Sequence, residues 1–304
     1  MTAAGGPGEA PGGGAPGGLG PRVTVVIATR DRADELATTI GHLRALPERP
    51  PVIVVDNDSS DGSVDRVRRQ WPDVTVVALP RNAGAAARTA GVRRSATPYV
   101  AFSDDDSWWA PGALARAADT LDAYPRLGVL AAKVLLGRDG RVDPTCEEMA
   151  ASPLAATRAL PGPPVLGFIA CAAVVRRDAY LSAGGFCERL MVGGEEELLA
   201  IDLAAAGFDL AYVDAVTAHH HPSPARDRAA RGRRIARNRL LISWLRRPTG
   251  HAVRATLAAA GDAGRRPVLV GALPALPWAL RHRRVVPPDL ERALRALEAA
   301  PVSR

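Results

Sequence analysis

The strongest constraint on how this chain can fold is a regular alternation in its N-terminal third. Short apolar runs rich in β-branched residues alternate there with segments of helical pattern. The apolar runs are residues 23–27, 51–55, 74–78 and 99–102, and the helical segments are 33–46, 64–70 and 82–95. Continuous apolar strands separated by helices are typical of a parallel sheet that helices cover on both faces. The sequence therefore predicts an α/β fold.

Polar residues gather where three of these predicted strands end. They lie at 28–32, at 56–62 and at the acidic triplet Asp104-Asp105-Asp106. Open α/β sheets bind ligands outside the carboxyl ends of their strands. Three consecutive carboxylates repel one another, which favours a hard divalent cation with oxygen ligands as their counter-charge. The alternative is a solvated acidic turn that caps the following helix.

Charge and cysteine content narrow the class of protein. The chain has 304 residues and a formal net charge of +7. Nucleic-acid binding is not expected, because no basic stripe with interleaved aromatic residues accompanies the charge. The excess instead favours an acidic substrate or an anionic membrane surface. The three cysteines are odd in number and lack metal-type spacing, so a reducing, cytoplasmic compartment is expected, with the inner face of the membrane as a further location.

Differences in amino-acid composition divide the chain into three segments. Residues 1–21 are almost entirely Gly, Pro and Ala, which predicts a disordered leader and not a signal peptide. Residues 22–224 form the predicted catalytic domain. Residues 225–304 form a predicted C-terminal helical extension that begins with an amphipathic helix at 226–247. The apolar run 268–280 is too short and too broken by Pro to span a bilayer, so it either lies at a membrane surface or covers the domain.

In chain order, four motifs closely resemble the family 2 glycosyltransferases of the GT-A fold. They are residues 25–32, residues 54–62, residues 81–84 with Ala90-Gly91, and residues 102–106. Gly184-Gly185-Phe186 and residues 194–197 support the resemblance, which runs from about Val23 to the His219-His220-His221 cluster. It implies a GT-A type, Rossmann-like mixed and mainly parallel sheet flanked by helices.

The same resemblance implies a site for a nucleotide-sugar donor and for Mg²⁺ or Mn²⁺. Asp104 would approach the ribose or the metal, and Asp106 would ligate the metal that bridges the diphosphate. For Asp105 a mainly local structural role is the alternative to donor binding. A turn or a helix cap is the alternative for the residues around Asp56 and Asn82. The implied donor-binding residues are Thr29, Arg32, Asp56, Asp58, Asn82, Gly84, Asp104 and Asp105.

Transfer to a hydroxyl acceptor needs a base that removes the hydroxyl proton. In the family this is the second acidic residue of a pair at the start of a helix, some way before an Ala-Gly dipeptide. Glu195-Glu196 precedes Ala206-Gly207 with matching spacing, which favours Glu196 as the catalytic base. Glu195 and Glu197 are alternatives, because Glu replaces the usual Asp. Taken alone, three Glu in one helical turn would simply complement the helix dipole.

Histidine and tryptophan complete the predicted site. In the family a His at the end of a late strand often completes the metal coordination, and spacing favours His219, with His220 next. Trp108 and Trp109 either wall the acceptor or pack in the core.

The predicted function is metal-dependent, inverting transfer of a sugar from a nucleotide-diphosphate sugar to a hydroxyl acceptor. The acceptor class is a polysaccharide, a lipid-linked molecule or a small glycoside, and peripheral membrane contact is a further prediction. A nucleotidyltransferase on a similar sheet is one alternative, although the chain lacks a Gly-rich, Lys-containing N-terminal loop. A catalytically inactive sugar-nucleotide-binding protein is the other.

Overall fold

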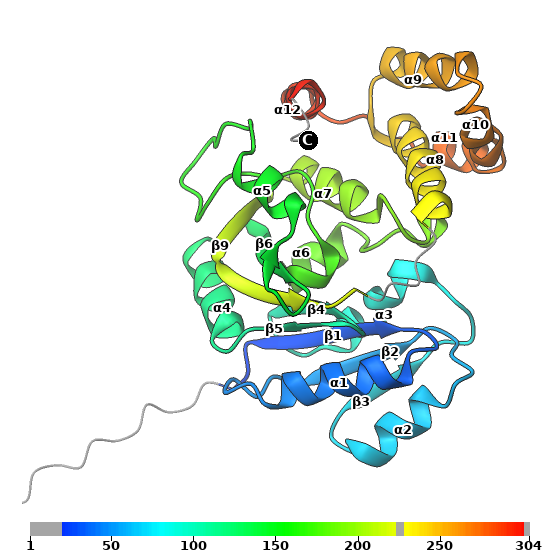
Figure 1. Cartoon of the computed structure of the whole chain (residues 1–304). Helices are drawn as coiled ribbons and strands as arrows, with labels where there is room; N and C mark the ends of the chain where they lie inside the picture. The colour runs from blue at the N-terminus through cyan, green and yellow to red at the C-terminus, as the bar shows by residue number, and fades with distance from the viewer. Residues whose placement is uncertain (1–19, 223–227, 301–304) are drawn as a thin grey trace, which may run out of the picture.

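A nine-stranded mixed sheet forms the centre of the molecule (Figure 1). The structure, a computed structural model, describes residues 20–222 and 228–300, so nearly all of the predicted leader lies outside the described residues. The strand order is β3-β2-β1-β4-β8-β6-β9-β5, with β7 paired to β6. Helices flank this sheet, as the sequence predicts.

The first four strands form the parallel half of the sheet. They are β1 (Val23–Thr29), β2 (Val52–Asp56), β3 (Thr75–Ala78) and β4 (Tyr99–Asp104). The connecting helices are α1 (Ala33–Arg44), α2 (Ser63–Gln70) and a 3₁₀ turn, η1 (Gly84–Ala86), that leads into α3 (Ala87–Arg94). The prediction of alternating strands and helices is therefore confirmed, and β1, β2 and β4 are almost entirely buried.

The second half of the sheet mixes strand directions. Strand β8 runs antiparallel between β4 and β6, whereas β9 is parallel to β6 and antiparallel to β5. The strands and helices of this half are β5 (Ser107–Trp109), α4 (Ala113–Ala123), β6 (Leu127–Leu136), β7 (Arg141–Val142), α5 (Pro144–Ala150), η2 (Ala170–Ala172), β8 (Ala173–Arg176), α6 (Arg177–Ser182), η3 (Glu188–Leu190), α7 (Glu195–Ala205) and β9 (Asp209–His220).

Close contact between α3 and the sheet depends on Gly91. A Cβ added there would lie 2.5 Å from Cγ1 of Val26 and 3.0 Å from Cγ2 of Val55, and both valines are fully buried. Helix α3 can approach β1 and β2 this closely only because position 91 has no side chain.

Gly91→Ala is therefore expected to lower the free energy of unfolding by about 1–3 kcal/mol, because the added methyl group overpacks the core. Gly41→Ala is the matched control within α1, where no atom lies within 4 Å of the added Cβ. That variant is expected to gain about 0.5–1 kcal/mol. Urea denaturation measures both, and equal stability of the two variants would contradict the packing argument.

The C-terminal extension is helical. It comprises α8 (Arg228–Arg246), α9 (Thr249–Gly261), α10 (Arg266–Ala272), η4 (Leu273–Ala275), α11 (Leu276–Arg281) and α12 (Pro288–Ala299). A second apolar cluster joins α8 to the catalytic half through Leu240, Leu241 and Ile242 on one side and Leu198 and Ile201 of α7 on the other. The amphipathic helix predicted at 226–247 thus packs its apolar face on the domain, at least from residue 228 onward.

Polar contacts fix α8 and α12 beside α7. The buried Asn238 side chain donates to the carbonyl oxygen of Leu190 at 2.8 Å, and Arg246 donates to Asp202 at 2.8 Å. Arg247 is buried and donates through Nε to Glu291 of α12 at 2.6 Å. Among the described residues, no helix is both long and apolar enough to cross a bilayer.

Candidate active site

The ends of β1, β2 and β4 lie side by side in the sheet. Thr29 is in register with Asp56, and Ala28 is in register with Asp104. The acidic triplet therefore lies directly beside the end of β1, as the sequence predicts for a parallel sheet. A cleft of about 1290 Å³ opens at this edge. Because typical small-molecule sites measure about 300–1,000 Å³, this cleft has room for more than one substrate.

The three aspartates of the triplet have different surroundings. Asp104 forms an ion pair with the buried Arg88. Asp105 is buried, and the Thr29 hydroxyl donates to its carboxylate at 3.1 Å. Asp106 is also buried, and its Oδ1 lies 3.3 Å from Nε2 of His220. The triplet is thus built into the sheet edge and is not a solvated turn.

Arg32 lies between the two buried aspartates. Its Nε is 3.8 Å from Oδ1 of Asp105, and its Nη1 is 3.9 Å from Oδ2 of Asp106. Burial and the carboxylates of Asp104 and Asp106 nevertheless raise the pKa of Asp105 to about 7. The single guanidinium of Arg32 therefore does not compensate all the negative charge at this edge.

The side chains around the triplet fit a divalent cation. Both ring nitrogens of His220 are buried without a hydrogen bond among the described residues. Asp104, Cys171 and His220 offer ligand atoms that all lie within 4.8 Å of one another. Carboxylate oxygens and imidazole suit Mg²⁺ or Mn²⁺, whereas burial raises the pKa of Cys171 well above its usual value and keeps it a neutral thiol. Asp104 and His220 are therefore the fitting donors of this group, and Asp106, which does not line the cleft, lies 3.3 Å from His220 behind them.

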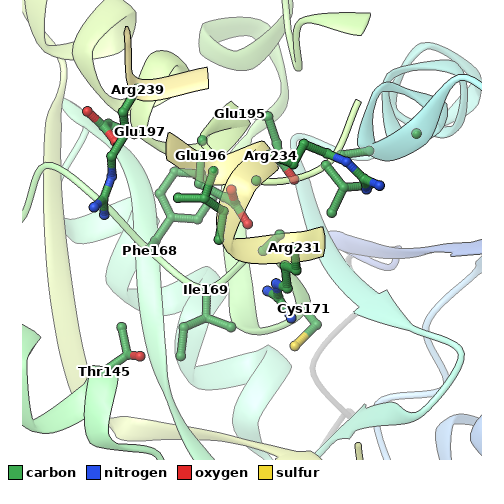
Figure 2. Close-up of a pocket in the computed structure, with 18 of the residues that line it drawn as sticks. Thr145, Phe168, Ile169, Cys171, Glu195, Glu196, Glu197, Arg231, Arg234 and Arg239 are labelled. Carbon is green, nitrogen blue, oxygen red and sulfur yellow. The ribbon is translucent and has the colours of Figure 1, made fainter. Parts of the chain in front are cut away.

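Three glutamates open helix α7 on the same cleft. Glu195, Glu196 and Glu197 follow Gly193 and Gly194, both of which have a positive φ that favours glycine. All three line the cleft, and Figure 2 shows them around the same space as the arginines of α8. The donor-side carboxylates and these glutamates thus share one cavity.

The three glutamates differ in their partners. Burial raises the pKa of Glu197 as well, and Arg239, whose Nε lies 3.5 Å from the Glu197 carboxylate, partly opposes this shift. Glu195 is buried, and its Oε2 has no hydrogen bond among the described residues. Burial and the neighbouring Glu195 carboxylate raise the pKa of Glu196 to about 8. A carboxyl group with a pKa near the working pH is suited to proton transfer, and Glu197 is in addition engaged by Arg239, which favours Glu196 over Glu197.

Comparison with known proteins identifies the family. Residues 24–182 match the family described as Glycosyl transferase family 2, which is more than half of the chain. The chain belongs to glycosyltransferase family 2. Its resemblance to this family in the sequence is thereby confirmed, and the protein is an enzyme of the glycosyltransferase class.

Two curated relatives come from Mycobacterium tuberculosis (strain ATCC 25618 / H37Rv). The N-acetylglucosaminyl-diphospho-decaprenol L-rhamnosyltransferase is 27% identical over 244 residues, which cover 68% of this chain and 78% of that protein. The pre-mycofactocin glycosyltransferase is 32% identical over 220 residues, covering 69% of this chain and 45% of the relative.

Two solved structures show the same fold. A mannosyltransferase from Pyrobaculum calidifontis, in complex with GDP-Man and Mn²⁺, superposes with a TM-score of 0.58 and 22% identity, covering 93% of this chain and 76% of that one. TarS from S. aureus superposes with a TM-score of 0.56 and 16% identity, covering 90% of this chain and 50% of that one. The family 2 glycosyltransferase therefore has the GT-A fold.

The structure corrects the choice between the two histidines. Successive side chains of a strand point to opposite faces, so His219 and His220 of β9 cannot both face the acidic triplet. His220 approaches Asp106, whereas the His219 ring stacks with Trp108 at 5.9 Å between ring centroids. The sequence spacing favoured His219 as the metal ligand, but the geometry favours His220.

His220→Ala is accordingly expected to weaken Mn²⁺ binding by at least about tenfold, since even residues that only support metal ligands cost 10–100-fold when changed. His219→Ala is the matched control from the next position of the strand and should leave Mn²⁺ affinity unchanged. Calorimetric titration with Mn²⁺ measures both variants. A larger loss in the His219 variant would reverse the assignment.

Of the two alternatives for the tryptophans, the structure fits core packing better than an acceptor role. Trp109 is fully buried in the core. Trp108 stacks on His42, with ring centroids 3.9 Å apart, and does not line the cleft. Their apolar rings follow the triplet in sequence, but the strand β5 carries them into packed surroundings. Phe168 is an aromatic residue that does line the cleft (Figure 2).

Two predicted donor residues, Asp56 and Asp58, lie at the end of β2 without lining the cleft. Asp56 is buried and accepts a hydrogen bond from the backbone of Ser59 at 3.1 Å, and Asp58 is exposed with a φ of 67°. Between them, Asn57 lines the cleft, and its side chain donates to the carbonyl oxygen of Gly84 at 3.0 Å. In this structure, Asn57 and not its acidic neighbours faces the cavity.

Asn82 and Gly84 line the cleft but also have a structural role. The Asn82 side chain accepts from the backbone of Gly84 at 2.9 Å. A Cβ at position 84 would lie 2.5 Å from the carbonyl oxygen of Met191. Gly84 thus lets η1 contact the loop that precedes α7. This contact joins the strand ends that carry the acidic triplet to the helix that carries the glutamates.

Apart from Arg32, sequence reasoning missed the arginines of the site. Arg88 lies one helical turn after Gly84, and its charge acts on Asp104 as well as on Glu195. Arg231 and Arg234 lie near the start of α8 and line the cleft. The four-residue spacing from Gly84 could have indicated Arg88, because it places both on one face of a helix. No local signal places the arginines of α8 at the cleft.

Proposed function

We propose that this glycosyltransferase carries out metal-dependent, inverting transfer of a sugar from a nucleotide-diphosphate sugar to a hydroxyl acceptor. The observation that carries the proposal is a single cleft with a divalent-cation donor set on one wall and Glu196 on the other. Family 2 membership disfavours the nucleotidyltransferase alternative. The remaining alternative is a family member that binds the sugar nucleotide without turnover, and the donor panel distinguishes it from an active transferase.

In the proposed mechanism the donor binds at the ends of β1 and β4. Asp104, Asp106 and His220 would hold Mg²⁺ or Mn²⁺, which supplies Lewis-acid stabilisation of the charge that develops on the departing diphosphate. Thr29 and Arg32 hold Asp105 and Asp106 in place at this wall. Mn²⁺ and a nucleotide sugar in the P. calidifontis structure support this assignment.

Glu196 then acts as the base. Its carboxylate removes the proton of the acceptor hydroxyl, and the hydroxyl oxygen forms a bond to the sugar C1 as the bond from C1 to the diphosphate oxygen breaks. A single displacement of this kind inverts the anomeric configuration. The proton ends on Glu196 and returns to solvent after the products leave.

We assign a lipid-linked hydroxyl compound as the acceptor class. The rhamnosyltransferase relative is named for a diphospho-decaprenol substrate. In this chain Arg231 and Arg234 provide positive charge in the cleft, where the phosphates of such an acceptor would lie. The same acceptor class fits an enzyme at the cytoplasmic face of a membrane.

A donor panel tests the proposal. Purified protein is mixed with UDP-, GDP- and dTDP-sugars, with and without Mn²⁺, and followed by thermal shift and by release of nucleoside diphosphate. At least one donor should stabilise the protein only when Mn²⁺ is present and should hydrolyse slowly. Absence of binding to every donor would reject the proposal, and binding without hydrolysis or transfer would support the inactive alternative.

The raised pKa of Glu196 predicts the pH dependence. A base works only when ionised, so kcat should rise with pH and level off above about 8. Because the Glu195 carboxylate contributes to the raised pKa, Glu195→Gln should move this rise to lower pH while activity is retained. Steady-state rates across pH 6–9 measure the effect.

The matched control for this pH experiment is Glu197→Gln, which should leave the position of the rise almost unchanged. Loss of activity in the Glu195 variant at every pH would assign the base to Glu195 instead. The carboxyl groups of Glu195 and Glu196 interact, so the apparent pKa that the wild-type pH profile gives belongs to the pair.

A further inference from the structure

The helices of residues 249–285 place their apolar residues in an unusual way. Soluble helices normally bury their large apolar side chains. Here every buried residue is an alanine, at positions 252, 259, 272, 275 and 279. The large apolar residues with exposed fractions of 39–65% in this segment are Val253, Leu257, Val270, Leu273, Leu280 and Val285.

This pattern is concentrated in one part of the molecule. In residues 20–222 and 228–300, the only other exposed large apolar residues are Val142 and Val192. The stretch from α9 to just beyond α11 therefore carries six of these eight exposed residues: four lie on α9, α10 and α11, Leu273 lies in η4, and Val285 follows α11. A face of this kind indicates contact with an apolar medium.

Unpaired positive charge accompanies the exposed apolar residues. Arg254, Arg266, Arg281 and Arg284 are exposed, and none forms an ion pair within the described part of the chain. Asp262 is the only acidic residue between positions 249 and 285. We define the lipid face as these four arginines together with the six exposed apolar residues.

Most residues of the lipid face belong to helices that pack on α8. Helices α9, α10 and α11 form a layer beyond α8, away from the sheet (Figure 1). Arg237 of α8 donates to the carbonyl oxygen of Gly271 in α10 at 3.3 Å. The first turns of α8 line the cleft through Arg231 and Arg234. One helix thus connects the lipid face to the active site.

We propose that the lipid face docks on the surface of an anionic phospholipid bilayer. The exposed Val and Leu side chains enter the boundary between headgroups and acyl chains, and the arginines contact the lipid phosphates. A second copy of the chain fits less well, because a symmetric dimer through this face would oppose its own four arginines. Docking would place the cleft within reach of a lipid-linked acceptor in the membrane. This last step rests on the proposed function.

Vesicle co-sedimentation tests the proposal. Wild-type protein is mixed with phosphatidylcholine vesicles and with vesicles that also contain phosphatidylglycerol, and it should bind only the second kind strongly. A triple variant, Leu257→Ser with Leu273→Ser and Leu280→Ser, should lose at least about a hundredfold of this affinity. The positions are exposed, so the fold should be retained, and thermal unfolding checks this.

Two further variants separate the contributions. Arg254→Gln combined with Arg281→Gln and Arg284→Gln should weaken binding to the anionic vesicles by about fivefold per arginine, with no effect on neutral vesicles. Val142→Ser is the matched control, since Val142 is equally an exposed apolar residue but lies on β7. It should bind vesicles like the wild type.

Three results would overturn the proposal. They are failure of the wild type to bind anionic vesicles, full binding by the triple serine variant, or a dimer in light scattering that the serine substitutions dissociate. Vesicle binding needs no donor, and donor binding needs no vesicle. Thermal shift with a nucleotide sugar and Mn²⁺ therefore tests the proposed function independently, and the serine variants should leave it unchanged.

Discussion

Glu196→Gln is expected to lower kcat by about 10²–10⁴-fold and to leave donor affinity unchanged. Glutamine keeps the shape of the side chain but cannot accept the proton of the acceptor hydroxyl. Glu196 lines the cleft and has a raised pKa, whereas it has no arginine partner comparable to the Arg239 that faces Glu197. Release of nucleoside diphosphate in the presence of acceptor measures kcat, and calorimetry measures donor affinity.

Glu197→Gln is the control for this experiment. The substitution removes a carboxylate from the same helical turn as Glu196. In the wild type, the Glu197 carboxylate lies 3.5 Å from Nε of Arg239. We expect a small effect on kcat, since Glu197 has no proton-transfer role in the mechanism. Undiminished turnover by the Glu196 variant would assign the base to Glu195.

Asp106→Asn is expected to reduce metal-dependent donor binding and kcat/KM by at least about a hundredfold. A metal at this site contributes several kcal/mol of charge stabilisation, and the amide is a much weaker ligand than the carboxylate. Asp106 is buried, and its Oδ1 lies 3.3 Å from Nε2 of His220. Donor affinity is measured with Mn²⁺ and again after addition of a chelator.

Asp58→Asn is the matched control for Asp106. Asp58 follows a neighbouring strand, is exposed and does not line the cleft. The substitution should therefore leave the Mn²⁺ dependence intact. If the chelator had no effect on wild-type donor binding, the proposed metal dependence would fail regardless of the variants.

Local sequence patterns predicted the sheet and the edge that carries the site. The predicted apolar runs end at residues 27, 55 and 102, and the structure ends β1, β2 and β4 one or two residues later, at Thr29, Asp56 and Asp104. Parallel pairing then brings the polar residues that follow to one edge. The sheet and its functional edge can therefore be predicted from local sequence, because strand periodicity and the order of the strands in the chain are sufficient.

Residue-level choices depended on register and on distant contacts. His219 and His220 are adjacent in sequence, and only the pairing of β9 decides which one faces Asp106. Trp109 lies three residues after Asp106, yet the strand that contains it places it in the core. A shift of one residue would exchange these outcomes, so sequence spacing could not predict them.

The sequence by itself determined the fold family, the acidic edge of the sheet and the glutamate-rich start of α7, because each rests on short-range patterns. Only the tertiary structure decided that Arg88 pairs with Asp104, that α8 and α12 close over the cleft, and that six large apolar residues between positions 253 and 285 are exposed. These features arise between segments far apart in the chain. Their geometry is set by packing, which no local pattern encodes.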